Sequence, residues 1–136
     1  MKTELRPGIT KSKEIVVDRA RTVDFMGEEL RVYATPELVR DFEVLCRELL
    51  LDYVDAGEDS VGTGISVTHS GATMLGGKVT VTATIRQVNG RQVTFELLGR
   101  DEHKEISRGE HGRFVVEKAK LRSRLAAEAA RAKPAG

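Results

Sequence analysis

The sequence predicts an α+β fold in which an antiparallel sheet wraps around one long central helix, with a further helix at the C-terminus. Three observations carry this prediction. Apolar residues recur with the period of a helix over residues 38–53. From residue 61 onward the period changes to two, as in half-buried strands. An Asn-Gly pair at 89–90 lies between two alternating segments and is typical of a two-residue hairpin turn.

The central helix has the clearest start in the sequence. Thr35 is expected to be its N-cap, because Pro36 then takes the first helical position and an acid follows in the first turn. Gly57 is expected to end the helix as its C-cap. Most apolar side chains of the segment share one wide arc, but Val44 and Leu51 lie on the opposite side. We therefore expect the helix to be buried on more than one side.

Strands are expected on either side of this helix, over residues 13–18, 61–70, 78–88, 91–99 and 106–117. The tail from Glu117 is rich in alanine and charge and predicts a C-terminal helix that ends before Pro134. We expect one domain over residues 1–136, with 1–12 and 133–136 flexible. A strand, a long helix and a four-stranded meander form the layout called the hotdog fold. Because one helix covers only part of so long a sheet, we expect a homodimer.

Composition excludes several classes of protein. The 22 basic and 21 acidic residues nearly cancel, so the chain lacks the basic excess of a nucleic-acid binder. With four Phe, two Tyr and no Trp, it also lacks the aromatic side chains of a base-stacking platform. The single cysteine, Cys46, favours a cytoplasmic protein. The sequence contains neither a signal-peptide core nor an apolar run long enough to span a membrane, so we expect a soluble protein.

Three polar residues lie in apolar surroundings and are candidates for chemistry. Thr35 is an N-cap by position, yet a capping hydroxyl keeps its own proton free to donate. Glu43, eight residues later, is either a half-exposed partner of Arg47 or a carboxylate at the rim of a pocket. His69 ends the apolar row of its strand. It is either a structural strand-end residue or an imidazole suited to proton transfer near pH 7.

The remaining histidines are weaker candidates. His103 lies in a charged turn and is expected to be solvated, whereas His111 shares a strand face with Arg113. The three histidines have no ligand-like spacing, and the sequence has no CxxC, HExxH, Walker loop or GxSxG motif. We therefore predict neither a metal nor a cofactor.

Three motifs together resemble a known family. "VYATPELVRDFEVLC" places Ala-Thr-Pro at the helix start and a Glu eight residues after the Thr. "SVGTGISVTHSGAT" has Val-Gly-Thr, a His seven residues after the Gly, and then Ala-Thr. "GEHGRFVV" has Gly-x-His-x-Arg before a β-branched pair. In this order and spacing they resemble the fluoroacetyl-CoA thioesterase-like family of hotdog-fold acyl-CoA thioesterases, and the similarity covers most of the chain.

The resemblance implies a homodimeric acyl-CoA thioesterase in which coenzyme A is part of the substrate. The family's catalytic constellation would map onto Thr35, Glu43 and His69, and its substrate-positioning glycine and arginine onto Gly62 and Arg113. Glu43 and His69 would activate water or the Thr35 hydroxyl, and His69 would protonate the departing thiolate. The sequence leaves open whether Thr35 attacks or orients water.

Substrate choice is expected to differ from that of the namesake enzyme. The segment between Val23 and Val32 is shorter than that enzyme's aromatic-bearing lid and offers only Phe25 and Met26. We therefore expect a small to medium acyl group, without assigning discrimination for fluorinated acyl groups.

Two other functions compete with this one. Hotdog enoyl-CoA hydratases carry an Asp and a His five residues apart, whereas here Glu43 is followed by Glu48 and the helix has no His. The other alternative is a hotdog protein that binds acyl-CoA without turnover.

Overall fold

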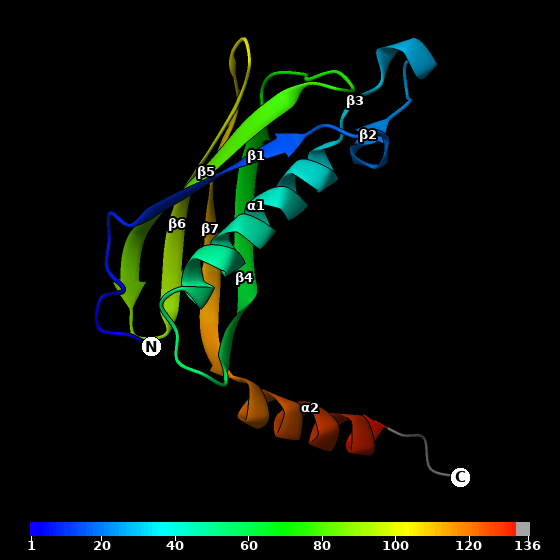
Figure 1. Ribbon diagram of the computed structural model, residues 1–136. Coiled ribbons are helices and arrows are strands. Elements are labelled where there is room, and N and C mark those ends of the chain that lie inside the picture. Colours follow the sequence, from blue (N-terminus) through cyan, green and yellow to red (C-terminus); the bar gives the residue numbers. More distant parts are fainter. Residues whose placement is uncertain (133–136) are drawn as a thin grey trace.

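The computed structural model describes residues 1–132 and has the predicted α+β architecture (Figure 1). In chain order its elements are β1 (Thr10–Val16), the 3-10 helix η1 (Arg19–Arg21), β2 (Thr22–Val23), the 3-10 helix η2 (Glu28–Leu30), β3 (Val32–Tyr33), α1 (Thr35–Leu51), β4 (Glu58–His69), β5 (Lys78–Asn89), β6 (Gln92–Asp101), β7 (Glu105–Glu117) and α2 (Lys118–Ala132). The predicted α+β layout is thus confirmed, but the predicted four-stranded meander is wrong. Only β5, β6 and β7 are sequential neighbours, because the chain between β4 and β5 crosses the sheet and β4 pairs with β7 instead of β5.

The five long strands form one antiparallel sheet in the order β1-β5-β6-β7-β4. Helix α1 lies across one face of this sheet, and α2 projects from its lower end (Figure 1). Strand β5 shows the alternation that the sequence predicted, since Val79, Val81 and Ala83 are fully buried while Thr80 is exposed on the other face. The core is therefore the layer between α1 and the inner face of the sheet.

The N-terminal segment belongs to this packed domain. Leu5 is buried, and the Lys2 amide donates a hydrogen bond of 2.8 Å to the carbonyl of Tyr53. Strand β1 begins at Thr10, opposite Thr84 of β5. The expectation of flexibility over residues 1–12 is therefore wrong for most of that segment, because a buried leucine and strand pairing fix it. The same expectation for residues 133–136 lies outside the described residues.

Helix α1 begins and ends differently from the prediction. Its N-cap is Ala34, and Thr35 is the first helical residue. The helix ends at Leu51, where the Asp52 amide donates to the carbonyls of Leu49 and Leu50. Gly57 lies beyond the helix with a φ of +88°, in the turn that leads into β4. The prediction of both caps was wrong. A threonine just before a proline, or a glycine a few residues beyond a helix, has the residue type of a cap whether or not it occupies the capping position.

The outer side of α1 is less buried than expected. Leu38, Phe42 and Leu45 face the sheet and are fully buried. Val44 and Leu51, by contrast, are 38% and 40% exposed, so the helix is covered on one side only. No helix within residues 1–132 is long and apolar enough to cross a membrane.

Strand β4 lies at one edge of the sheet and pairs only with β7 among the described strands. All residues from 61 to 66 are exposed. Two of them are large and apolar, because Val61 and Ile65 are each 39% exposed, and Phe114 opposite Val61 is 41% exposed. An apolar edge strand with unpaired backbone groups is a template for further strand pairing.

Candidate active site

The first functional pair forms where α1 begins and β4 ends. Thr35 Oγ1 lies 2.8 Å from His69 Nδ1, so the hydroxyl and the imidazole share a hydrogen bond. Strand β4 delivers His69 as its last residue, and α1 delivers Thr35 as its first. The hydroxyl of Thr35, which was expected to cap the helix, is therefore hydrogen-bonded to His69 instead. This is the spacing of a hydroxyl and its general base.

The imidazole of His69 is held in a largely apolar environment. Burial lowers the pKa of His69, and the backbone of Gly71 only partly opposes this effect. The ring of Tyr33 meets it edge-on, with centroids 6.2 Å apart. No described residue is hydrogen-bonded to its buried Nε2 atom. His69 is therefore neutral near pH 7 and able to accept a proton.

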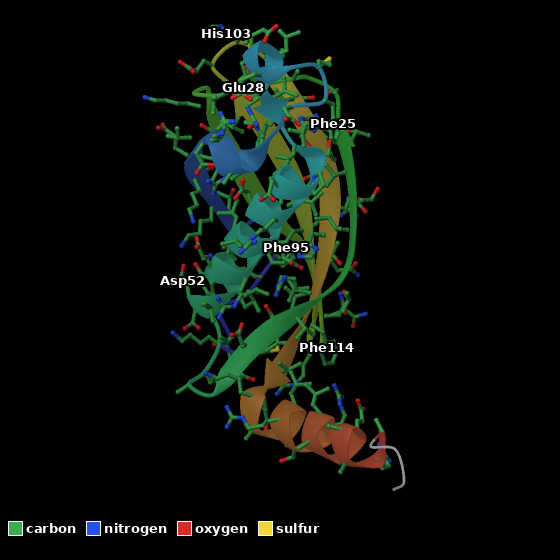
Figure 2. All side chains as sticks on the ribbon, turned by 90° about the vertical axis from the view of Figure 1, so that its right-hand side faces the viewer. Phe25, Glu28, Asp52, Phe95, His103 and Phe114 are labelled. Carbon is green, nitrogen blue, oxygen red and sulfur yellow. The ribbon has the colours of Figure 1, made fainter. Side chains whose placement is uncertain are left out.

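A cavity of about 450 Å³ opens beside this pair. Its walls come from α1's first turn, from the loop after β4, and from the segment before α1. They comprise Val23, Phe25, Val32, Tyr33, Ala34, Thr35, Pro36, His69, Ser70, Gly71 and Ala72. Phe25 is 87% exposed at the same end of the molecule as Glu28 (Figure 2). A largely apolar cavity with the hydrogen-bonded Thr35 hydroxyl and His69 imidazole at its wall suits an acyl chain ending in a reactive carbonyl.

A second cluster surrounds Glu43 midway along α1. Glu43 Oε2 accepts a hydrogen bond of 3.3 Å from Arg113 Nη1, and the Arg113 side chain is buried. Arg113 is oriented by Ser60, since its Nε donates to the hydroxyl at 2.8 Å and its Nη2 to the carbonyl at 2.9 Å. A Cβ atom added to Gly62 would lie 2.5 Å from Glu43 Oε2. Gly62 is therefore the residue that leaves room for this carboxylate.

His111 belongs to the Glu43 cluster, although no role was predicted for it beyond its place in the third motif. Its side chain is 2% exposed, and its Nδ1 lies 2.7 Å from the carbonyl oxygen of Gly64. Arg113 Nη1 lies 3.1 Å from His111 Nε2. Since a guanidinium only donates, Nε2 is the acceptor and Nδ1–H donates to Gly64. Burial lowers the pKa of His111, so this neutral form persists. In the sequence, the signal that could have placed His111 in this cluster was its two-residue spacing from Arg113, which puts both side chains on one face of the strand.

The two clusters do not meet within one chain. Thr35 and Glu43 are eight residues apart on α1, which corresponds to roughly 12 Å along its axis. The alternative pairing of Glu43 with Arg47 is wrong, because Arg47 makes a two-pronged ion pair with Asp59 at 3.0 and 2.8 Å. Of the five predicted site residues, Thr35 and His69 are thus together, and Glu43, Gly62 and Arg113 are together elsewhere.

Metal binding finds little support in this geometry. Within residues 1–132, no group of three or more His, Cys, Asp or Glu side chains is arranged to hold a metal ion. His103 lies in the exposed turn between β6 and β7, where its amide donates to Asp101.

The comparisons with known proteins all indicate the same family. Residues 17–119 match the family model described as fluoroacetyl-CoA-specific thioesterase. The curated fluoroacetyl-CoA thioesterase of Streptantibioticus cattleyicolor is 34% identical over 132 residues, covering 92% of this chain and 95% of that relative. A solved structure of the fluoroacetyl-CoA thioesterase FlK has a TM-score of 0.83 at 32% identity, covering 96% of this chain and 98% of that one. A thioesterase-superfamily protein from Thermus thermophilus has a TM-score of 0.86 at 25% identity, covering 95% and 96%.

The fold is therefore that of the hotdog thioesterases. Within this class, the chain belongs to the fluoroacetyl-CoA-specific thioesterase family. The resemblance predicted from three short motifs is confirmed, and so, at the level of the family, is the prediction of a thioester hydrolase.

Proposed function

We propose that this chain hydrolyses small to medium acyl-CoA thioesters to the free acid and CoA. The observation that carries the proposal is the 2.8 Å contact between Thr35 and His69 at the wall of an apolar cavity. The acyl chain occupies the cavity, and the thioester carbonyl approaches the N-terminal end of α1, where the helix dipole favours a developing oxyanion. The reaction requires water and no further cofactor. A cytoplasmic location is part of the proposal, as the lone buried thiol of Cys46 suits a reducing compartment.

Two routes are consistent with the same groups. In the first, His69 accepts the Thr35 proton, the threonine oxygen attacks the thioester carbonyl, and water later hydrolyses the acyl-threonine ester. In the second, Thr35 orients a water molecule whose proton passes to Glu43 or His69. In both, the carbon–sulfur bond breaks and the group that accepted the proton, His69 or Glu43, returns it to the thiolate of CoA. Arg113 and Gly62 hold the Glu43 carboxylate in position.

We further propose a homodimer formed through the edges of two β4 strands. The exposed apolar side chains of Val61 and Ile65 on an unpaired edge support this arrangement. In an isologous antiparallel pair, the His69 end of one β4 lies beside the opposite end of the other. An axis between Ile65 and Ser66 would set Gly62 of one protomer directly opposite His69 of the other. The Glu43 carboxylate beside that glycine would then complete the partner's Thr35–His69 pair.

Mixing two inactive variants tests both the chemistry and this arrangement. Glu43→Gln and His69→Ala should each reduce thiol release from a panel of acyl-CoAs to a small residual rate while remaining folded. If Glu43 acts on the partner's pair, unfolding and refolding the two variants together creates heterodimers with one intact site. Random association then restores about a quarter of wild-type activity.

Each contrary result has a defined meaning. Inactivity of the mixed sample, with both single variants inactive, would place Glu43 and His69 of one site in the same protomer. Near-wild-type turnover by both single variants would refute the proposed catalytic groups. Wild-type protein that binds acyl-CoA without releasing thiol would be a binding protein, and hydration of an enoyl-CoA would indicate a hydratase.

A further inference from the structure

A buried ionic network lies next to the acyl cavity and is not used in the proposed reaction. Asp41 of α1 is 8% exposed and accepts hydrogen bonds from two residues that precede the helix. Arg21 donates two hydrogen bonds to this carboxylate, from Nε at 2.9 Å and from Nη2 at 3.1 Å. The hydroxyl of Tyr33 donates to the same carboxylate. Burial together with this carboxylate raises the pKa of Tyr33, so its hydroxyl remains a donor.

The network joins the cavity wall to the helix. Residues 18–33, which we call the lid segment, contribute Val23, Phe25, Val32 and Tyr33 to the cavity lining. Arg21 stands at the entry of this segment, and its carbonyl also accepts the amide of Ala34 at 2.8 Å, just before α1. Tyr33 stands at its exit and lies edge-on against His69. Asp41 therefore holds both ends of the lid segment against α1.

The lid segment between these two ends is cross-linked within itself. Arg31 donates to Glu28 at 2.9 Å and to the hydroxyl of Thr22 at 3.1 Å, and Arg19 also pairs with Glu28. The middle of the segment is weakly packed, because Phe25 and Met26 are 87% and 61% exposed, whereas its end is fixed by the buried Tyr33, whose amide donates to the Thr73 carbonyl at 2.8 Å. A segment that is stitched internally but poorly packed moves as a unit once its anchor is released.

The burial of Asp41 indicates that its contacts with Arg21 and Tyr33 have a role beyond a surface ion pair. An ionised carboxylate is costly to bury unless its oxygens are fully hydrogen-bonded. The pair between Arg47 of α1 and Asp59 of β4 has the same two-pronged geometry, but its side chains are 49% and 20% exposed, against 30% and 10% for Arg21 and Asp41, and neither residue belongs to the lid segment. That pair provides a matched comparison within the same molecule.

We propose that Asp41 is a positioning residue that keeps the lid segment closed and thereby limits the length of the acyl group. It acts through Arg21, which fixes the side of the cavity carrying Val23 and Phe25, and through Tyr33, which backs His69. This inference rests on the proposed thioesterase activity, since acyl length is read from that reaction. Closure of the lid segment, however, can be measured without any substrate.

Three variants and a control test the proposal. Arg21→Gln removes the two-pronged donor, Asp41→Asn removes the charge while retaining one acceptor oxygen, and Arg47→Gln is the control. We expect Arg21→Gln and Asp41→Asn to shift the ratio of kcat/KM for octanoyl-CoA over acetyl-CoA about tenfold toward octanoyl-CoA. We also expect amide hydrogen exchange over residues 22–33 to quicken about tenfold while that of β5–β7 stays unchanged. If the charge variants fail to fold, Tyr33→Phe, which keeps the ring, should show the same two changes at smaller size.

The outcomes separate the positioning role from a merely structural one. Equal loss of activity toward both substrates, with unchanged exchange in the lid segment, would overturn the proposal. So would an equal shift in Arg47→Gln. If wild-type protein hydrolyses no acyl-CoA, the proposed function fails, and the exchange data alone decide. Faster exchange over 22–33 would then support the role of Asp41 in closing the lid segment, and unchanged exchange would refute it.

Discussion

Replacing Gly62 by alanine should damage catalysis with little damage to the fold. A Cβ atom at this position would lie 2.5 Å from Glu43 Oε2, where ordinary van der Waals contact begins at 3.4 Å. The other two close atoms, on His111 and Arg113, lie at 3.4 and 3.5 Å and are not compressed. The substitution therefore acts on one group, because the flexible glutamate can move away whereas the strand cannot.

The size of the effect follows from this geometry. Glu43 Oε2 must retreat by about 0.9 Å, which breaks its 3.3 Å contact with Arg113. A misplacement of about 1 Å in a catalytic group can cost on the order of 100-fold in rate, so we expect kcat to fall about 10- to 100-fold. The Glu43 side chain is 51% exposed, and a solvent-exposed ion pair contributes about 0–1 kcal/mol. The melting temperature should accordingly fall by less than about 5 °C.

The assay compares thiol release and thermal unfolding in four variants. Gly112→Ala is the steric control, because its added Cβ would meet the ends of Gln92 and Thr63 at 2.9 Å without touching Glu43. The double variant Gly62→Ala with Glu43→Gln should be no slower than Glu43→Gln alone, since both changes remove the same group. Wild-type kcat in Gly62→Ala, equal losses in both glycine variants, or additive losses in the double variant would each refute the reasoning.

Three further predictions concern other parts of the molecule. Because burial lowers the pKa of His69, hydrolysis should lose rate only as the pH falls below the ordinary imidazole value of about 6.5. The same shift contributes stability that is present above that pH and lost below it; a pH–rate profile whose acidic limb lies above pH 7 would contradict this. Ile65→Lys should convert dimer to monomer in sedimentation and reduce kcat, whereas Thr80→Lys on the outer sheet face should do neither. Cys46 is fully buried and its pKa is raised to about 12, so a thiol reagent should label it only on unfolding, and labelling of the native protein would contradict this.

The sequence predicted the layers of this fold because periodicity reports burial directly. The helix, the strands and the hairpin at 89–90 all follow from which side chains must avoid water. Helix ends were predicted less well, because the same residue types satisfy several local roles. Thr35 has the side chain of an N-cap, but its hydroxyl bonds His69, which lies 34 residues away. Local sequence cannot show that such a distant partner is available.

The membership of the two clusters could not be predicted for a related reason. Spacing along α1 shows that Glu43 is two turns from Thr35, but it does not show which strand residues face each turn. That depends on the register of β4 against β7, where Gly62 lies opposite Arg113 and an irregularity follows before Gly64. Only this register brings Arg113 and His111 to Glu43. Motif resemblance predicted most of these residues as site residues without indicating that they form two groups.

The separation of the two groups has a consequence for how substrate choice can change. His69 and Thr35 are fixed by the end of an edge strand and the start of the central helix, which are parts of the packed domain. The outer wall of the acyl cavity comes instead from the lid segment, which is tied to α1 by the Arg21–Asp41 ion pair and exposes Phe25. Substitutions in residues 18–33 can therefore alter which acyl group fits without disturbing the groups that we propose act on the carbonyl. Hence the acyl specificity of one family member does not transfer to another on the strength of shared catalytic residues; it must be read from the lid segment of each chain.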